Sequence, residues 1–191
     1  MKLQKYRKYY KNDQLVTEGM LKNGKKHGIW TNYYENGHVL SKSKYKNGKE
    51  HGVSTHFDQS GNIEFIIHYK NDEKNGKTLS YKNGILCSQD MYKDGCLNGR
   101  SIVYNSNGNV KIFGTYKNSQ KHGLFTYYNK NNVIIKKKRY FDGDRHGVWE
   151  YYKKNGSIDY KEYYSFGIDV DINGEEVLPP PSILSIGGFF R

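Results

Sequence analysis

The stretch YKNGKEHGVSTHFDQSGNI, residues 45–63, contains three glycines and only isolated apolar residues. The glycines stand at positions 48, 52 and 61, directly after Asn, His and Ser. An Asn-Gly pair between runs of β-branched and aromatic residues is the common signal of a two-residue hairpin turn. The stretch therefore predicts short strands joined by tight turns.

The pattern of residues 45–63 recurs along the chain with an almost constant period, which is the mark of a repeat architecture. The glycine after His or Asn is found at Gly28, Gly52, Gly76, Gly99, Gly123 and Gly147. Successive members are 24, 24, 23, 24 and 24 residues apart. We predict an all-β fold, an elongated single-layer antiparallel β-meander of repeated hairpins with about a dozen short strands.

The repeat divides the chain into four parts. We expect an N-terminal half repeat or cap over residues 1–18 and six hairpin repeats of 23 or 24 residues over 19–164. A capping hairpin is expected over 165–178, followed by an apolar tail over 179–191 that begins with three prolines. The apolar end of this tail either folds back onto the sheet or docks elsewhere.

Composition sets limits on the core and on the partners. Only 35% of the residues are hydrophobic, and 19 residues are Tyr, so we expect a thin core. The net charge of +12 indicates either an anionic partner or lysines spread over a solvated surface. Two cysteines do not make a disulfide framework. The first ten residues are not an apolar leader, and we expect a cytoplasmic protein.

Three ladders of similar residues run through the six units, and alternation along a strand assigns them to faces. A register with Tyr33 opposite Val39 and Tyr45 opposite Val53 places all three ladders on one face, which we expect to be structural. The ladders are Tyr33, Phe57, Tyr81, Tyr104, Tyr128 and Tyr152; Val39, Ile63, Leu86, Val110, Ile134 and Ile158; and Tyr45, Tyr69, Tyr92, Tyr116, Tyr140 and Tyr164.

The other expected face varies between units and gathers aromatic and basic residues toward the C-terminus. We predict that it binds a partner through Trp30, Phe125, Tyr127, Ile135, Lys137, Arg139, Trp149 and Tyr151. Aromatic residues rimmed by Lys and Arg are typical of protein-binding hot spots. Alternatively, a single-layer sheet needs aromatic residues on both faces for stability. If these residues bind a partner, replacing Trp149 and Tyr151 by Ala should weaken capture and leave the sheet folded.

The repeat resembles a known family. The pattern Y-x-[ND]-G-x-x-[HN]-G, at Tyr45–Gly52, Tyr92–Gly99 and Tyr140–Gly147, resembles a MORN repeat, without the glycine that the standard form has two places further on. The form HG-x-W-x-x-YY-x-x-NG, at His146–Gly156, is similar to the MORN-variant repeats of bacterial YwqK-type antitoxins. The resemblance implies an elongated, curved sheet that neutralises a partner toxin by binding it. MORN repeats elsewhere are associated with protein scaffolds and membranes.

Catalytic and cofactor sites are not expected. The sequence contains no Gly-rich phosphate loop and no nucleophile elbow. The slot before the recurring glycine holds His27, His51, Asn75, Asn98, His122 and His146. Equivalent slots lie two strands apart, roughly 9.5 Å, whereas a shared zinc needs Zn–N distances of about 2.0–2.1 Å. We therefore expect no enzyme, no cofactor and no metal.

The leading hypothesis is a non-catalytic antitoxin or immunity-type module that binds a partner protein, expected to be a toxin. The alternative is a membrane- or envelope-associated scaffold that binds anionic lipid or other proteins. Binding of single-stranded nucleic acid through Tyr and Lys ranks third.

Overall fold

Two-residue turns with left-handed backbone close the hairpins of the computed structural model, which describes residues 2–177. At one such turn Asn47 has φ 54° and Gly48 has φ 89°, a conformation that Asn and Gly adopt at low cost. Asn118 and Ser119 have φ values of 49° and 68° at the equivalent turn. The turn therefore keeps its geometry where Ser119 replaces the glycine at the second turn position.

Strands follow one another along the described chain, and residues 2–177 contain no helix. The strands are β1 (Leu3–Tyr9), β2 (Leu15–Lys22), β3 (Lys25–Tyr33), β4 (Val39–Lys46), β5 (Lys49–Phe57), β6 (Ile63–Lys70), β7 (Glu73–Lys82), β8 (Ile85–Lys93), β9 (Cys96–Tyr104), β10 (Val110–Lys117), β11 (Gln120–Lys121), β12 (Gly123–Tyr128), β13 (Ile134–Phe141), β14 (Asp144–Arg145), β15 (Gly147–Tyr152), β16 (Ile158–Ser165) and β17 (Ile168–Val170).

The expected dozen strands are corrected to seventeen. The six repeats supply β3 to β16, in which two long strands are each divided at a histidine, β11 from β12 at His122 and β14 from β15 at His146. The N–H groups of these histidines bond back to Thr115 and Arg139 on the preceding strand, next to a glycine with positive φ. Of the remaining strands, β1 and β17 lie outside residues 19–164, and β2 overlaps the start of that range.

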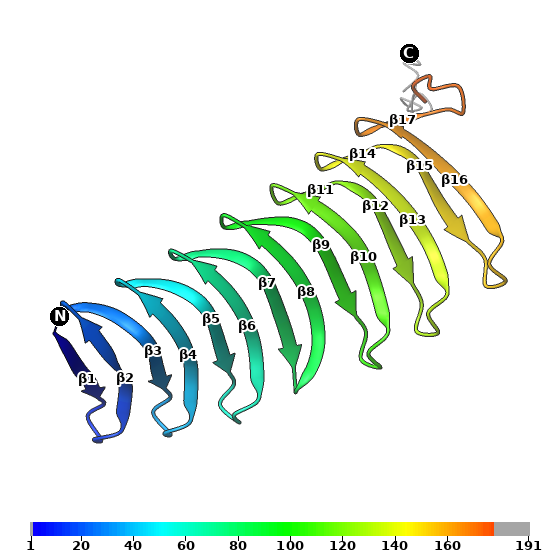
Figure 1. Cartoon of the computed structure of the whole chain (residues 1–191). Coiled ribbons are helices and arrows are strands. Elements are labelled where there is room, and N and C mark those ends of the chain that lie inside the picture. Colours follow the sequence, from blue (N-terminus) through cyan, green and yellow to red (C-terminus); the bar gives the residue numbers. More distant parts are fainter. Residues whose placement is uncertain (1, 178–191) are drawn as a thin grey trace, which may run out of the picture.

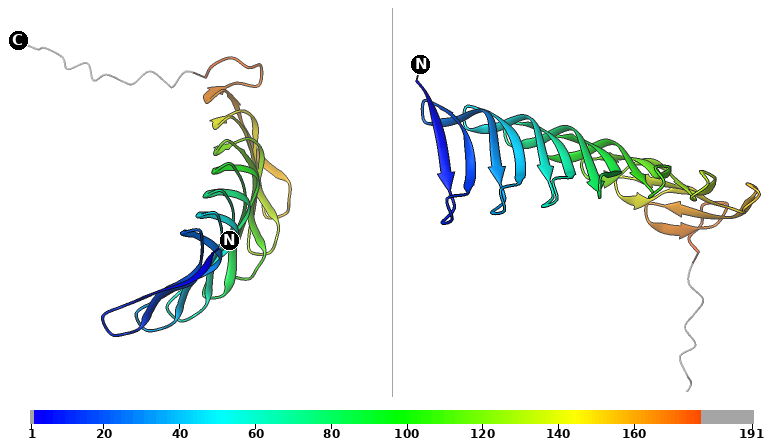
Figure 2. Two further views of the ribbon diagram at one scale, coloured as in Figure 1. Left: turned by 60° about the vertical axis from the view of Figure 1, so that its left-hand side comes forward. Right: turned by 90° about the horizontal axis from the view of Figure 1, so that it is seen from below.

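Strands that follow one another pair antiparallel, so the chain forms one open sheet of consecutive hairpins. The divided strands share one partner, since β11 and β12 both pair with β10, and β14 and β15 both pair with β13. The predicted all-β meander is confirmed. The hairpins are curved, and the row of hairpins winds from β1 to β17 without a second layer (Figure 1 and Figure 2). Among the described residues, no helix is long and apolar enough to cross a membrane.

A β-bulge in each repeat decides which side chains share a face. Tyr33 lies opposite Val39 as predicted, but Asn32 lies opposite Ser41, so Leu40 is an extra residue in β4. A bulge of this kind leaves one residue unpaired and changes the alternation on the bulged strand. The same shift recurs in the five later units.

The expected pairing of Tyr45 with Val53 is wrong. Tyr45 lies opposite Gly28 on β3 and Glu50 on β5. The register shifts again between Ser43 and Tyr45, where β5 carries the additional residues. Sequence periodicity does not reveal these shifts, because they leave the spacing between units unchanged.

The two faces consequently differ from the expected ones. Tyr45 shares a face with Trp30 and Ser43, since Trp30 pairs with Ser43 two residues away. Tyr33 lies on the other side, where its hydroxyl donates to Glu18 at 3.0 Å. We call the side that carries the ladder Tyr45, Tyr69, Tyr92, Tyr116, Tyr140 and Tyr164 the tyrosine face, and the other side the opposite face.

The core is a central row on the tyrosine face. Trp30 and Phe125 are each 2% exposed there, and small residues such as Ser54 are equally closed off. The matching position on the opposite face is open, with Ile29 66% and Val53 44% exposed. Bending toward the tyrosine face crowds the side chains on that side, so we assign the tyrosine face to the concave side of the curved hairpins (Figure 2).

The two ends of the repeat array are closed differently. At the N-terminus, β1 and β2 form a complete hairpin, and Tyr6 of β1 packs on Trp30 with ring centroids 5.4 Å apart. At the C-terminus, β17 pairs with β16, and a bridge between Val170 and Glu176 forms a short terminal hairpin. The expected tail over 179–191 lies outside the described residues.

Candidate interaction surfaces

The aromatic members of the predicted binding patch lie on the tyrosine face. Trp149 is 6% exposed, and Trp30 and Phe125 are still more deeply buried. Tyr127 and Tyr151 are half-buried on the same face. Three of the predicted contact residues are thus structural core, and two remain within reach of a partner.

The other members of the predicted patch are not brought together with these rings. Lys137 lies opposite Thr126, and Arg139 lies opposite Leu124, which places both cations on the opposite face. Ile135 sits at the bulge and is 40% exposed. The bulge at the start of β13 is the physical reason, because it reverses the alternation on which the prediction relied.

Two glycines outside the repeating series make room for two of the buried core rings, Trp30 and Phe125. A Cβ at Gly114 would lie 2.6 Å from Phe125 Cζ, and a Cβ at Gly19 would lie 2.6 Å from Trp30 Cγ. Neither glycine has a positive φ, so both are needed for space rather than for a turn. Their signal in the sequence is a spacing, since each stands eleven residues before its aromatic partner.

Two of the units without this glycine use the opposite combination of sizes, whereas Ser43 faces Ser54 and Lys138 lies against Trp149 in the other two. The position of Gly114 is occupied by Ile67 and by Asp90 in earlier units, and the ring is replaced there by Thr78 and by Ser101. Protein interiors are packed to nearly constant density, so a large residue on one strand requires a small one on the next. The variation on this face is therefore partly volume compensation within the core.

The C-terminal half of the tyrosine face contains a continuous row of rings. Phe125 lies between Tyr116 and Tyr140 with centroid distances of 5.4 and 5.3 Å. Trp149 lies between Tyr140 and Tyr164 with distances of 5.3 and 4.6 Å. Tilted and edge-to-face pairs in this range each stabilise by about 0.5–1.5 kcal/mol beyond the buried area. Burial raises the pKa of the Tyr140 hydroxyl.

Cations cover this row of rings. Lys138 Nζ stands 3.9 Å from the Trp149 ring centroid, and the Arg145 guanidinium stands 4.3 Å from that of Tyr164. Burial lowers the pKa of Lys138, and the neighbouring charge of Lys136 lowers it further. Cation–π contacts of this kind hold the cations close to the sheet and keep the concave side positive.

One part of the ringed surface remains open to a partner. Tyr151 and Tyr160 are stacked with centroids 4.3 Å apart, and Tyr160 is 49% exposed. Lys136 Nζ lies 4.7 Å from the centroid of Tyr127 beside them. We call the group Tyr127, Lys136, Lys138, Tyr151 and Tyr160 the aromatic–lysine surface. It offers flat rings next to two ammonium groups, and it presents no arrangement of groups for covalent catalysis.

The opposite face carries cations without acidic neighbours over most of its length. From β3 to β13, neither of its two central rows contains Asp or Glu, whereas Glu18 and Glu150 mark the two limits. The first row is Thr31, Lys42, Thr55, Ile66, Leu79, Gln89, Ile102, Phe113, Thr126 and Lys137, and the second is Ile29, Lys44, Val53, His68, Lys77, Met91, Arg100, Thr115, Leu124 and Arg139.

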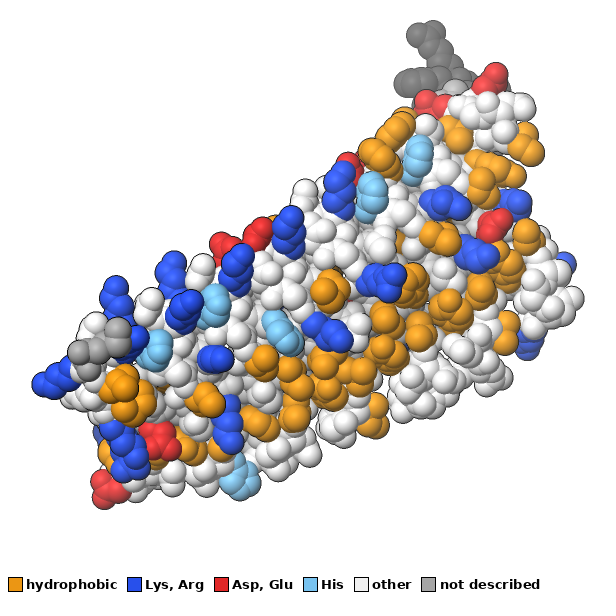
Figure 3. Space-filling model, in the orientation of Figure 1, with side chains coloured by type: hydrophobic (Ala, Val, Ile, Leu, Met, Phe, Trp, Pro, Cys, Tyr) orange, Lys and Arg blue, Asp and Glu red, His pale blue; other side chains and the backbone are white. Residues whose placement is uncertain are grey.

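We call these two rows the basic stripe. Among residues 2–177, no salt bridge joins its Lys42, Lys44, Lys77 or Arg100 to a carboxylate. Figure 3 shows a face of the molecule on which Lys and Arg side chains are scattered beside a band of hydrophobic ones that runs across the sheet. Such a surface combines positive potential with apolar area.

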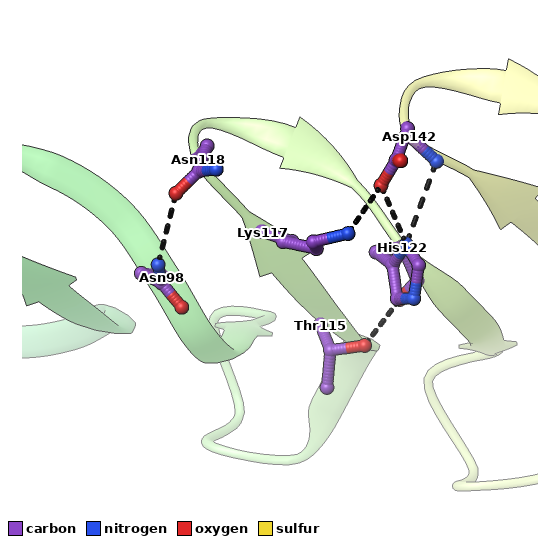
Figure 4. Close-up of polar contacts among 6 residues, drawn as sticks. All are labelled: Asn98, Thr115, Lys117, Asn118, His122 and Asp142. Atoms are coloured by element: carbon purple, nitrogen blue, oxygen red, sulfur yellow. Dashed lines mark hydrogen bonds and ion pairs between the residues drawn. The ribbon is translucent and has the colours of Figure 1, made fainter.

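At four of its six positions, the histidine slot connects successive turns. His122 Nδ1 lies 3.0 Å from Asp142 Oδ1, and Lys117 Nζ lies 3.3 Å from the same oxygen. One unit earlier, Asn98 Nδ2 donates to Asn118 Oδ1 at 3.3 Å (Figure 4). His and Asn are thus interchangeable here as partners for the next turn. In the described part of the chain, no three His, Cys, Asp or Glu side chains form a metal-binding group.

Comparison with known proteins identifies the repeats. The family model of the MORN repeat variant matches residues 26–47, 50–71, 97–118 and 145–165. These four segments are thus similar to the MORN repeat variant. The remaining two units share their register, since Gly76 lies opposite Tyr92 and Gly123 lies opposite Tyr140. No curated protein matches the chain.

The MORN repeat variant accounts for the open sheet of consecutive hairpins and indicates a generally non-enzymatic repeat module. The finer resemblance to an antitoxin family stays a prediction, as do the partner and the location of the protein in the cell.

Proposed function

We propose that this chain is a non-catalytic binding module of the antitoxin or immunity type, which neutralises a partner toxin by holding it on the aromatic–lysine surface. The observation that carries the proposal is the stacked pair of Tyr151 and Tyr160 beside Lys136. Exposed Tyr rings supply large contact area with few rotatable bonds, and such residues dominate the energetics of protein interfaces.

The location of this surface also supports the proposal. Repeats that stack on one another must keep their shared contacts, so specificity resides where the units differ. Tyr160 belongs to the last strand of the six repeats, and the equivalent position varies between units, with Ser41, Phe65, Ser88, Ile112 and Lys136 in the others. Lys136 and Lys138 outnumber the carboxylate of Glu162, which accepts from the Tyr151 hydroxyl at 2.9 Å, so the partner should present carboxylates to this surface.

Affinity capture from the source cell followed by mass spectrometry tests the surface. We expect a protein captured by the native chain to be lost with Tyr160→Ala and Lys136→Ala combined. The matched control is Tyr163→Ala combined with Lys161→Ala, which removes the same chemistry from the opposite side of β16. Unchanged capture by the first pair, or equal loss with the control pair, would place the binding site elsewhere.

Growth assays test the antitoxin role. The captured protein, expressed alone in a bacterial host, should arrest growth, and co-expression of the native chain should restore it. The double variant Tyr160→Ala and Lys136→Ala should restore growth poorly, while the control pair restores it fully. Normal growth with the captured protein alone would refute the antitoxin role and leave a binding module of another kind.

A further inference from the structure

We propose that the opposite face of β3 to β6 is a second docking surface, which binds an acidic, amphipathic segment of a partner protein. The central feature is a hollow of about 360 Å³ whose lining includes Ile29, Lys42, Lys44, Val53 and Thr55. Apolar and cationic side chains alternate around it. The hollow is distinct from the aromatic–lysine surface, which lies on the other side of the sheet at the far end of the array.

Two further hollows continue the central one across the strands. Ile29 also lines a hollow of about 190 Å³ that includes Met20 and Lys5. Lys42 also lines a hollow of about 490 Å³ that includes Phe57. Neighbouring strands are about 4.8 Å apart, so the three depressions form a track that runs across the strands. A peptide segment that crosses the strands can place successive side chains in them.

The apolar side chains of this track have no structural partner. Ile29 is 66% exposed and Val53 is 44% exposed, although both belong to regular strands. Later units carry Lys77 and Arg100 at the same position, so the fold does not require an aliphatic residue there. The last two units carry Leu124 and Val148 there, but both are half-buried, so the exposed aliphatic pair is confined to the first two units.

The charge of the track specifies the partner. Lys42 and Lys44 are exposed, and no carboxylate within residues 2–177 forms a salt bridge with either of them. Glu18, at the β2 end of the track, is already occupied by Arg7 at 3.2 Å. The basic stripe beyond Lys44 has no acidic residue up to Glu150. Carboxylates of an incoming segment would supply the missing counter-charges and steer its approach.

The shape of the surface favours a polypeptide over a lipid bilayer. The burial pattern assigns the track to the convex side of the curved hairpins, and a flat membrane could contact only a small part of such a surface. Discrete hollows of a few hundred Å³ match individual side chains, whereas a fluid lipid interface needs no such shape. The same cations would also attract anionic vesicles, so the experiment includes them.

The test uses the full chain and a labelled peptide in which Glu and Leu alternate, and it measures binding by fluorescence anisotropy at low and moderate salt. We expect binding that weakens as salt rises. Lys42→Glu combined with Lys44→Glu should weaken it roughly ten-fold or more, because two attractive contacts become repulsive. Ile29→Thr should weaken binding without changing the charge.

The matched control is Lys46→Glu combined with Lys49→Glu, which makes the same charge change at the turn of the same hairpin. We expect it to lose much less affinity than the Lys42 and Lys44 variant. Equal losses would overturn the proposal, because the attraction would then be non-specific. No binding of the peptide at low salt would also overturn it.

Vesicles of phosphatidylglycerol and phosphatidylcholine provide the last arm. If the native chain floats with these vesicles, the Lys42→Glu and Lys44→Glu variant does not, and the peptide does not bind, then the ligand of this surface is a membrane and the proposed protein segment is refuted. Peptide binding that survives Tyr160→Ala and Lys136→Ala would support the second surface, whatever becomes of the antitoxin role. Loss of peptide binding in that variant would refute the independence of the two surfaces.

Discussion

Gly114 and Phe125 should behave as one packing unit. Gly114→Ala places a methyl group where the Phe125 ring lies, 2.6 Å from Cζ, and overpacking of this kind typically costs about 1–3 kcal/mol. Phe125→Ala removes a ring that is 2% exposed and is expected to cost about 3–5 kcal/mol. In the double variant the methyl group at position 114 no longer meets a ring.

The double variant should therefore cost no more than Phe125→Ala alone. It can even recover roughly 0.5–1 kcal/mol, because alanine loses less backbone freedom than glycine in a strand. The coupling free energy between the two sites should be about 1–3 kcal/mol, within the range measured for residues in contact. Urea unfolding followed by far-UV circular dichroism, on both single variants and the double variant, measures it.

A pair without steric conflict serves as the control. The control double variant combines Phe125→Ala with Ser101→Ala, a change one unit away from the ring. The two losses in the free energy of unfolding should add. Additive costs for Gly114→Ala and Phe125→Ala, within about 0.5 kcal/mol, would refute the reasoning from ring overlap and would leave the glycine without a structural role.

Other predictions follow from burial and from the contacts between turns. Burial raises the pKa of the Tyr45 hydroxyl from 10.0 to about 12. Since the folded state keeps this proton to higher pH than the unfolded state, the free energy of unfolding should be unaffected below pH 10 and should fall as the pH rises toward 12. Circular dichroism, with absorbance at 295 nm to follow tyrosine ionisation, would show this. Unchanged stability through this range would contradict the burial of the ladder. His122→Asn should preserve stability, because Asn98 makes the equivalent contact, whereas His122→Ala should cost about 0.5–1.5 kcal/mol in urea unfolding. The pair Trp149→Ala and Tyr151→Ala is expected above to leave the sheet folded, but Trp149→Ala alone should cost about 3–5 kcal/mol because the ring is buried. Tyr160→Ala should cost much less in the same assay.

The periodic part of the structure follows from the sequence. The recurring glycines place the turns, and Asn, Asp or Ser supply positive φ where a glycine is replaced. The pairing of Tyr33 with Val39 was predictable from the turn between them. These features are local, and each depends on residues within one hairpin.

The faces could not be predicted in the same way. A single extra residue, Leu40, reverses the alternation, and nothing in the composition of β4 marks it as unpaired. The error carried over to the binding patch, where Lys137 and Arg139 were grouped with rings from which the sheet separates them. A test of which side chains compensate one another in size, such as Gly114 and Phe125, would have revealed the correct side.

The size compensation also limits how this array can gain or lose units. Each compensating pair joins the second strand of one hairpin to the first strand of the next, as Gly19 on β2 and Trp30 on β3 do. Copying the unit that begins with Trp30 would set the new indole against Ser43 instead of a glycine. Insertion or deletion of a hairpin is thus constrained by the contacts between adjacent hairpins. A transplanted hairpin fits only where the neighbouring hairpin supplies a residue of matching size.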